Sequence, residues 1–134
     1  MGTGAGLPGI LLSIVGYENV IMIDSVKKKT EFVSTIIKNL SLSSKILNKR
    51  IENLPTSKHD IIVSRALAPL KKLLIYSLMY SHKNTTALFL KGRNVNNEID
   101  IAMREFSFNF EKTKSLSSNE GFILKIKNIK TKNV

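Results

Sequence analysis

Closely spaced glycines open the chain and precede a carboxylate that ends an apolar run. The chain begins MGTGAGLPG, so every second position from Gly2 to Gly6 is a glycine. Glycine lets a backbone turn tightly and lie against a ligand, because no Cβ stands in the way. Asp24 follows the apolar run 20–23, and a carboxylate at such a strand end accepts both hydroxyls of an adenosine ribose. The two features together predict a site for an adenosine-containing cofactor.

The glycine loop alone leaves the cofactor open. Gly4, Gly6 and Gly9 also satisfy the G-x-G-x-x-G pattern of dinucleotide folds, and Asp24 lies at an acceptable distance for one. A nicotinamide-dependent oxidoreductase would also need a substrate domain or catalytic residues, for which 134 residues offer little room. A methyltransferase would use Gly2, Gly4 and Gly6 without a second domain. The structural alternative is a tight turn followed by a surface aspartate.

Short apolar runs alternate with amphipathic segments, which predicts an open α/β sheet. We expect helices over 8–15, 28–40, 70–80 and 95–106, and strands over 20–23, 45–47, 60–63 and 87–90. Two further extended runs, 107–114 and 122–126, are joined by a loop typical of an antiparallel hairpin. The prediction is one domain over residues 1–126, mostly parallel with an antiparallel C-terminal edge, and a frayed basic tail over 127–134.

Composition limits the class of protein. Cysteine is absent, which excludes disulfides and thiol chemistry and fits a reducing cytoplasm. The longest apolar stretch is about half of the ~18 residues that a membrane span needs, and we find no signal-type leader. We therefore expect a cytoplasmic monomer with no membrane partner. A net charge of +11 favours a nucleic-acid partner, although AT-rich codon usage also produces many lysines.

Five segments in a fixed order carry a family resemblance. They are the eight-residue glycine loop ending in Pro8-Gly9, Asp24-Ser25 with lysines after it, Arg50-Ile51-Glu52, Ser64-Arg65-Ala66 and Leu90-Lys91-Gly92. The loop and the Ser-Arg-Ala triplet are fairly specific, whereas Lys-Gly is weak by itself. Over nearly its whole length the chain resembles the RsmG (GidB) family. That resemblance implies a Rossmann-like S-adenosylmethionine-dependent methyltransferase fold.

The resemblance also implies a reaction and a set of cofactor contacts. The reaction is transfer of a methyl group from S-adenosylmethionine to N7 of a guanine in 16S ribosomal RNA of the small subunit. The implied contacts, with Gly4 and Gly6 added from the loop spacing, are Gly2, Gly4, Gly6, Leu7, Asp24, Ser25, Val26, Ile51, Glu52 and Arg65. Asp24 would hold the ribose, Ile51 would pack on the adenine and Glu52 would line its edge. Arg65 would reach the methionine carboxylate or a phosphate, with a surface ion pair as its alternative.

No catalytic acid–base pair and no metal site are expected. Guanine N7 has an in-plane lone pair and attacks a methyl group without first losing a proton, so alignment supplies the catalysis. His59 and His82 stand in polar settings, and we expect neither to be catalytic. Lysines 27–29 at a helix start oppose the helix dipole, which slightly favours contacts with RNA phosphates. For Lys91 and Arg93, a contact with an RNA phosphate and a solvated surface position are equally plausible.

The start of the chain gives one further expectation. Members of the resembled family carry a strand ending in an acidic residue just before the glycines, where this chain has Met1. We expect the first strand to be missing or truncated, leaving strands 20–23 and 60–63 with unpaired edges. Weak cofactor binding and weak methyl transfer would follow. The remaining alternative is a non-catalytic RNA-binding remnant of the fold.

Overall fold

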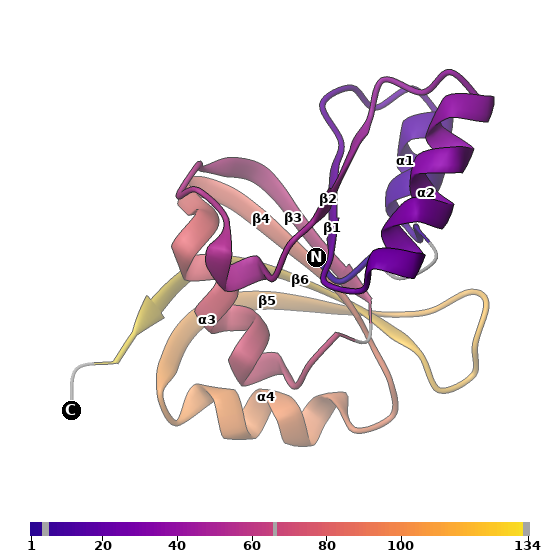
Figure 1. Ribbon diagram of the computed structural model, residues 1–134. Helices are drawn as coiled ribbons and strands as arrows, with labels where there is room; N and C mark the ends of the chain where they lie inside the picture. The colour runs from indigo at the N-terminus through magenta and orange to yellow at the C-terminus, as the bar shows by residue number, and fades with distance from the viewer. Residues whose placement is uncertain (4–5, 66, 133–134) are drawn as a thin grey trace. The chain divides into compact units, whose positions relative to one another are not determined.

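The computed structural model describes residues 1–3, 6–65 and 67–132, and its helices and strands alternate as predicted (Figure 1). The α-helices are α1 (Gly9–Ile14), α2 (Lys27–Asn39), α3 (Leu70–Tyr80) and α4 (Val95–Met103), and a 3-10 helix η1 spans Ile51–Asn53. The strands are β1 (Ile21–Asp24), β2 (Lys45–Asn48), β3 (His59–Arg65), β4 (Ser81–Lys91), β5 (Phe106–Lys114) and β6 (Phe122–Thr131). The α/β fold with a C-terminal hairpin is confirmed.

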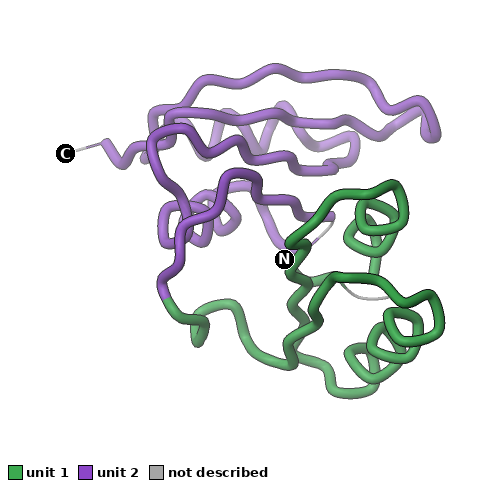
Figure 2. Tube along the Cα trace, turned by 90° about the horizontal axis from the view of Figure 1, so that it is seen from above, with its two compact units in different colours: residues 1–55 green, residues 56–134 purple. Residues whose placement is uncertain are grey.

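The chain divides into two compact units, residues 1–55 and residues 56–134 (Figure 2). In unit 1, β1 and β2 pair in parallel, and a small core of Ile10, Met22 and Val33 joins the helices to β1. Helix α2 buries a narrower stripe than its sequence predicts, since Phe32 and Leu40 are exposed. A sheet of two strands offers too little surface to cover the whole apolar face of the helix.

Unit 2 is a four-stranded sheet in the order β3-β4-β6-β5. Strand β3 runs parallel to β4, and the β5–β6 hairpin adds two antiparallel strands. Helices α3 and α4 lie on one face of this sheet (Figure 1), where Phe89, Leu124 and Ile126 are fully buried. Ile61 and Ile123 alternate with buried strand residues and remain 55% and 40% exposed. The sheet of unit 2 thus has one face covered by its own helices.

The single open sheet expected from the alternating pattern is replaced by two sheets. Among the described residues, β1 pairs with β2 and β3 pairs with β4, and no pairing joins β1 to β3. The sequence predicts unpaired edges at these two strands, and the topology confirms them.

Two boundaries near the C-terminus differ from prediction. The tail expected from residue 127 continues as strand β6 to Thr131, and the Lys132 N–H donates to the Glu105 carbonyl at 2.8 Å. Helix α4 ends at Met103, three residues early, because Phe106 starts β5 opposite Thr131 and is buried in the sheet. The frayed-tail prediction was wrong for residues 127–131, because the hairpin extends far enough to satisfy these backbone groups.

Candidate cofactor-binding site

Asp24 is held at the carboxyl end of β1. It stands opposite Asn48, the last residue of β2. The Asn48 side-chain amide donates to the Asp24 carbonyl at 3.2 Å, and the Lys49 N–H donates to the same oxygen at 3.1 Å. Asp24 is 8% exposed. Ligands of open α/β sheets bind at the carboxyl ends of parallel strands, so the carboxylate is placed where the sequence predicts it.

The Asp24 side chain also shapes the turn into α2. Its Oδ1 accepts a hydrogen bond from the Val26 N–H at 2.9 Å. Helix α2 starts at Lys27, and Val26 gives it no side-chain cap. The bond to Val26 therefore fixes both the path of Ser25 and Val26 and the direction of the carboxylate.

The glycine loop lies directly beside the end of β1. The Thr3 N–H donates to the Ile23 carbonyl at 2.9 Å, and the Gly6 N–H donates to the Thr3 carbonyl at 2.9 Å. Gly2 and Gly6 have φ values of +57° and +93°, in the left-handed region that favours glycine. The structure thus brings the loop and Asp24 together. Gly4 lies outside the described residues.

Gly6 and Gly9 have a packing role that the sequence analysis missed. A Cβ on Gly6 would stand 2.3 Å from Ile10 Cδ1, and one on Gly9 would stand 2.5 Å from Met22 Cγ. Both contacts are far too short for real Cβ atoms, so these glycines let α1 approach its neighbours closely. Gly9 belongs to the G-x-G-x-x-G pattern of the loop, so the sequence singled it out. It was not among the predicted cofactor contacts, and its packing against Met22 explains why a glycine is needed there.

The charge of Asp24 acts on the amino group of Met1. Burial lowers the pKa of that amino group to about 6, and the nearby Asp24 charge partly opposes the decrease. The direction follows from desolvation, which disfavours the charged form of an amine.

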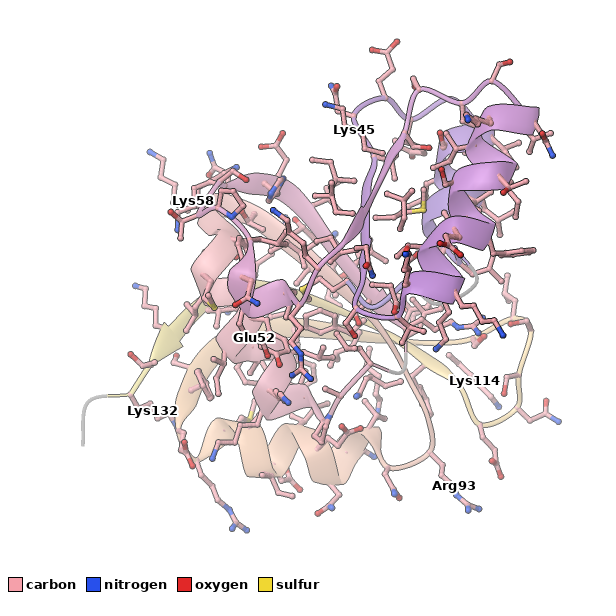
Figure 3. All side chains as sticks on the ribbon, in the orientation of Figure 1. Lys45, Glu52, Lys58, Arg93, Lys114 and Lys132 are labelled. Atoms are coloured by element: carbon pink, nitrogen blue, oxygen red, sulfur yellow. The ribbon has the colours of Figure 1, made fainter. Side chains whose placement is uncertain are left out.

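The remaining predicted contacts fall in two places. Ile51 is buried in η1, three residues after Asn48, and Glu52 beside it is exposed (Figure 3). Leu7 is partly exposed in the loop, and Ser25 and Val26 are exposed in the turn. Arg65 ends β3 in unit 2 and is exposed. Its role in cofactor binding stays a prediction from the sequence.

Lys91 is part of a buried ion pair. Its Nζ lies 2.9 Å from Glu98 Oε1 and donates to the Ala68 carbonyl at 2.9 Å. The Lys91 side chain is 6% exposed, so it fits neither of the two alternatives weighed for it, a phosphate contact or a solvated surface position. Arg93 differs, because its side chain is 78% exposed and lies 3.8 Å from Glu120. The sequence could not separate them, since both stand at the carboxyl end of the same apolar run, and Lys91 proves to be the last residue of β4.

One histidine–carboxylate pair was not predicted. His82 Nε2 lies 2.7 Å from Asp60 Oδ1, and the Asp60 side chain is 92% exposed. His59 stands opposite Ser81 in the parallel pairing of β3 and β4. Asp60 and His82, the next residues of the two strands, therefore lie close together at the amino ends of the strands. Ligands bind at the opposite, carboxyl end of such strands, so the pair is remote from that region of unit 2.

The part of the chain that the structure describes contains neither a membrane-spanning helix nor a cluster of metal ligands. None of its helices is both long enough and apolar enough to span a membrane. In the same residues, no three His, Cys, Asp or Glu side chains are grouped to hold a metal ion.

The fold is that of S-adenosylmethionine-dependent methyltransferases. A ribosomal protein L11 methylase from Lactobacillus delbrueckii subsp. bulgaricus superposes with a TM-score of 0.76 at 18% identity, covering 93% of this chain and 65% of that one. A TehB-like SAM-dependent methyltransferase from Corynebacterium glutamicum superposes with a TM-score of 0.70 at 15% identity, covering 94% and 76%. At these identities the likeness shows the fold alone.

Sequence similarity is more specific. The ribosomal RNA small subunit methyltransferase G of Orientia tsutsugamushi (strain Ikeda) is 39% identical over 127 residues, and that of Paramagnetospirillum magneticum is 30% identical over 129. These matches cover 95% and 96% of this chain but 63% of each relative, so the chain spans less than two thirds of their length. Residues 1–128 match the family described as GidB, rRNA small subunit methyltransferase G, and the chain belongs to that family.

Proposed function

We propose that this chain binds S-adenosylmethionine in unit 1 and transfers its methyl group to N7 of a guanine in 16S ribosomal RNA. The observation that carries the proposal is the position of Asp24. Its carboxylate is buried and oriented at the carboxyl end of β1, and the Thr3–Ile23 hydrogen bond holds the glycine loop against the same strand. Family membership over residues 1–128 supports the same cofactor and substrate.

The described residues suit the adenosine part of the cofactor. A carboxylate has about four acceptor positions, so Asp24 has the chemistry to accept ribose hydroxyls as well as the Val26 N–H. Ile51 supplies an apolar side chain just beyond β2, where an adenine ring would pack. Gly2, with positive φ, lets the loop backbone turn toward the ligand. Arg65 is included in the proposed site because the Ser64-Arg65-Ala66 motif resembles that of the family, and not because of a contact in the structure.

The proposed chemistry needs alignment more than proton transfer. Bound S-adenosylmethionine would supply a methyl group on its sulfonium sulfur. The in-plane lone pair of guanine N7 would form the new N–C bond as the S–C bond breaks, which releases S-adenosylhomocysteine. The chain would then have to hold the two reactants in line and exclude water, which lowers the entropic part of the barrier. The His82–Asp60 pair has no role in such a reaction.

The competing functions differ in what they bind. A nicotinamide-dependent oxidoreductase gains no support from the family or from the solved structures named above, all of which are methyl-transferring proteins by name. A non-catalytic RNA-binding protein would bind RNA and fail to bind the cofactor. Ligand specificity therefore separates the three functions.

Calorimetry tests the cofactor. We would titrate the chain with S-adenosylhomocysteine and, in parallel, with NAD. The proposal expects saturable binding of S-adenosylhomocysteine and no heat from NAD. Binding of NAD alone, or of neither compound, would contradict it.

Methyl transfer is tested on small ribosomal subunits that lack the modification. Tritiated methyl incorporation from S-adenosylmethionine measures the reaction, with the longer Orientia tsutsugamushi relative as positive control. Borohydride reduction and aniline cleavage then locate the product, because N7-methylguanosine is opened by this treatment. Incorporation without a cleavage site would assign another atom as the acceptor, and cofactor binding without any incorporation would leave a binding protein.

A further inference from the structure

A patch of cations and aromatic rings lies where the end of the hairpin meets the start of α4. We call it the hairpin patch and define it as Arg93, Phe110, Lys112, Lys114 and Phe122. Figure 3 shows Arg93 and Lys114 on the same side of unit 2, away from Lys132. The cofactor residues of unit 1 are not part of it.

The strand register sets the hairpin members on one face. Lys114 stands opposite Phe122, and Phe110 stands opposite Ile126. Opposed residues of antiparallel strands share a face, and alternate residues of one strand do as well. Ile126 is fully buried on that face, beneath the helices, whereas Phe110 is 39% exposed. Lys112 and Lys114 are exposed. The helices therefore cover this face near Ile126 and leave it open to solvent toward the end of the hairpin.

Side-chain contacts link the hairpin to the first turn of α4. Lys112 Nζ donates to Asn96 Oδ1 at 2.6 Å and lies 5.2 Å from the ring centroid of Phe122. Arg93 approaches Glu120 of the hairpin loop at 3.8 Å, with both side chains mostly exposed. These contacts place Lys112 beside the Phe122 ring and Arg93 beside the hairpin loop, and both cations remain exposed. An exposed ion pair at this distance contributes little and is easily replaced by another anion.

The charge of the patch favours an anionic partner. The patch contains three cations, Arg93, Lys112 and Lys114, and the carboxylate of Glu120 lies 3.8 Å from Arg93. Lys125 and Lys127 of β6 alternate with the buried Leu124 and Ile126, so they lie on the other face of the sheet, where Lys125 stands opposite Glu111, and they are not part of the patch. A patch of three cations attracts polyanions, with strong dependence on salt.

The aromatic rings and the place of the patch favour RNA over an acidic protein. Phe122 is half-buried and Phe110 is 39% exposed, and rings beside cations stack on unpaired bases while the cations contact phosphates. Phe122 also stands opposite Lys91, the last residue of β4. The patch is therefore at the carboxyl end of a parallel strand, where open α/β sheets bind their ligands.

We propose that the hairpin patch binds an unpaired segment of ribosomal RNA. Arg93, Lys112 and Lys114 contact its phosphates, and a base stacks on Phe122. The inference rests on the proposed function, because that function makes ribosomal RNA the substrate.

The first experiment compares two lysines with the same change of charge. A fluorescein-labelled single-stranded RNA of 16 nucleotides is titrated by anisotropy over a salt series, using the full chain. Lys114→Glu is expected to weaken binding about tenfold and to lower the slope of log affinity against log salt by about 1. The matched control is Lys83→Glu, at an exposed lysine near the amino end of β4, with less than a twofold effect. Equal losses from both variants would overturn the proposal.

The second experiment separates RNA from an acidic protein partner. Phe122→Leu keeps an apolar residue but removes the ring, and a lost stacking contact is expected to weaken RNA binding about tenfold with an unchanged salt slope. Polyglutamate of equal charge is expected to compete poorly with the RNA. If Phe122→Leu binds normally and polyglutamate competes as well as RNA, the patch is a surface for acidic partners and the proposal is wrong.

Failure of this proposal can be told from failure of the proposed function. Each variant is also titrated with S-adenosylhomocysteine and melted by circular dichroism. Loss of RNA affinity with normal melting supports the patch, even if the chain transfers no methyl group. Normal RNA affinity in Lys114→Glu and Phe122→Leu overturns the patch, even if methyl transfer is observed.

Discussion

At the scale of single residues, Asp24 has two roles that need different parts of its side chain. One carboxylate oxygen accepts the Val26 N–H and sets the turn into α2. The negative charge is needed for the proposed bond to the ribose hydroxyls. An amide in place of the carboxylate keeps an acceptor for Val26 and removes the charge, so substitution can separate structure from binding.

Asp24→Asn is predicted to weaken S-adenosylhomocysteine binding by about 1–3 kcal/mol, because a charged acceptor of two hydroxyls is replaced by a neutral one. Melting should change little, since the amide oxygen still accepts the Val26 N–H. Isothermal calorimetry measures the affinity. The control Glu18→Ala removes an exposed carboxylate of the same unit and should bind normally. Unchanged affinity in Asp24→Asn would mean that Asp24 serves the turn alone.

Gly6→Ala is predicted to destabilise the chain by about 1–3 kcal/mol. Its Cβ would stand 2.3 Å from Ile10 Cδ1 at a φ of +93°, so both overpacking and backbone strain oppose it. Urea denaturation followed by circular dichroism measures the loss. Gly92→Ala is the control, because a Cβ there meets nothing within 4 Å. Normal stability with weakened cofactor binding would instead assign Gly6 to the ligand alone.

At the scale of elements, a single carboxylate joins α3, α4 and β4. Glu98 of α4 accepts the Leu70 N–H at 2.9 Å and pairs with Lys91 of β4 at 2.9 Å. Helix α3 follows Pro69 and has no side-chain cap of its own. Glu98 therefore satisfies an N-terminal N–H of α3 and places a negative charge near the positive end of its dipole.

Glu98→Ala is predicted to lower the free energy of unfolding by about 2–4 kcal/mol. The substitution leaves the Lys91 ammonium buried without its carboxylate and the first turn of α3 without an acceptor. Chemical denaturation measures the loss. The control Asp100→Ala removes an exposed carboxylate from the same helix and should cost less than about 0.5 kcal/mol. Similar stabilities of the two variants would show that the buried pair contributes no more than an exposed charge.

The sequence predicts the elements and their order well, because apolar periodicity reflects burial along the chain. It also predicts Asp24 at a strand end and the loop beside it. Lys91 could not be predicted, since its burial depends on Glu98 seven residues later and on the Ala68 carbonyl in another loop. The His82–Asp60 pair likewise depends on strand register. Periodicity within one segment carries no information about either contact.

At the scale of the whole molecule, the two units carry different parts of the proposed function. Unit 1 holds Asp24, the glycine loop and η1, which we assign to the cofactor. Unit 2 holds the hairpin patch, which we assign to RNA. The division into two sheets follows from strand pairing, which a pattern of apolar residues does not specify. The two ligands should therefore leave separate signatures on the chain.

Amide hydrogen exchange is predicted to resolve those signatures. A ligand stabilises the segments that close around it, by about 2.7 kcal/mol at one hundred times its dissociation constant. S-adenosylhomocysteine at that excess should slow exchange by up to about a hundredfold at residues 21–26 and 45–53 and leave the hairpin of β5 and β6 unchanged. Exchange is read by mass spectrometry of peptic fragments, with NAD at equal concentration as the control. Local opening sets these rates, so each segment reports its own free energy. Equal slowing in unit 1 and in the hairpin would contradict the prediction that the cofactor leaves its signature on residues 21–26 and 45–53 and not on the hairpin.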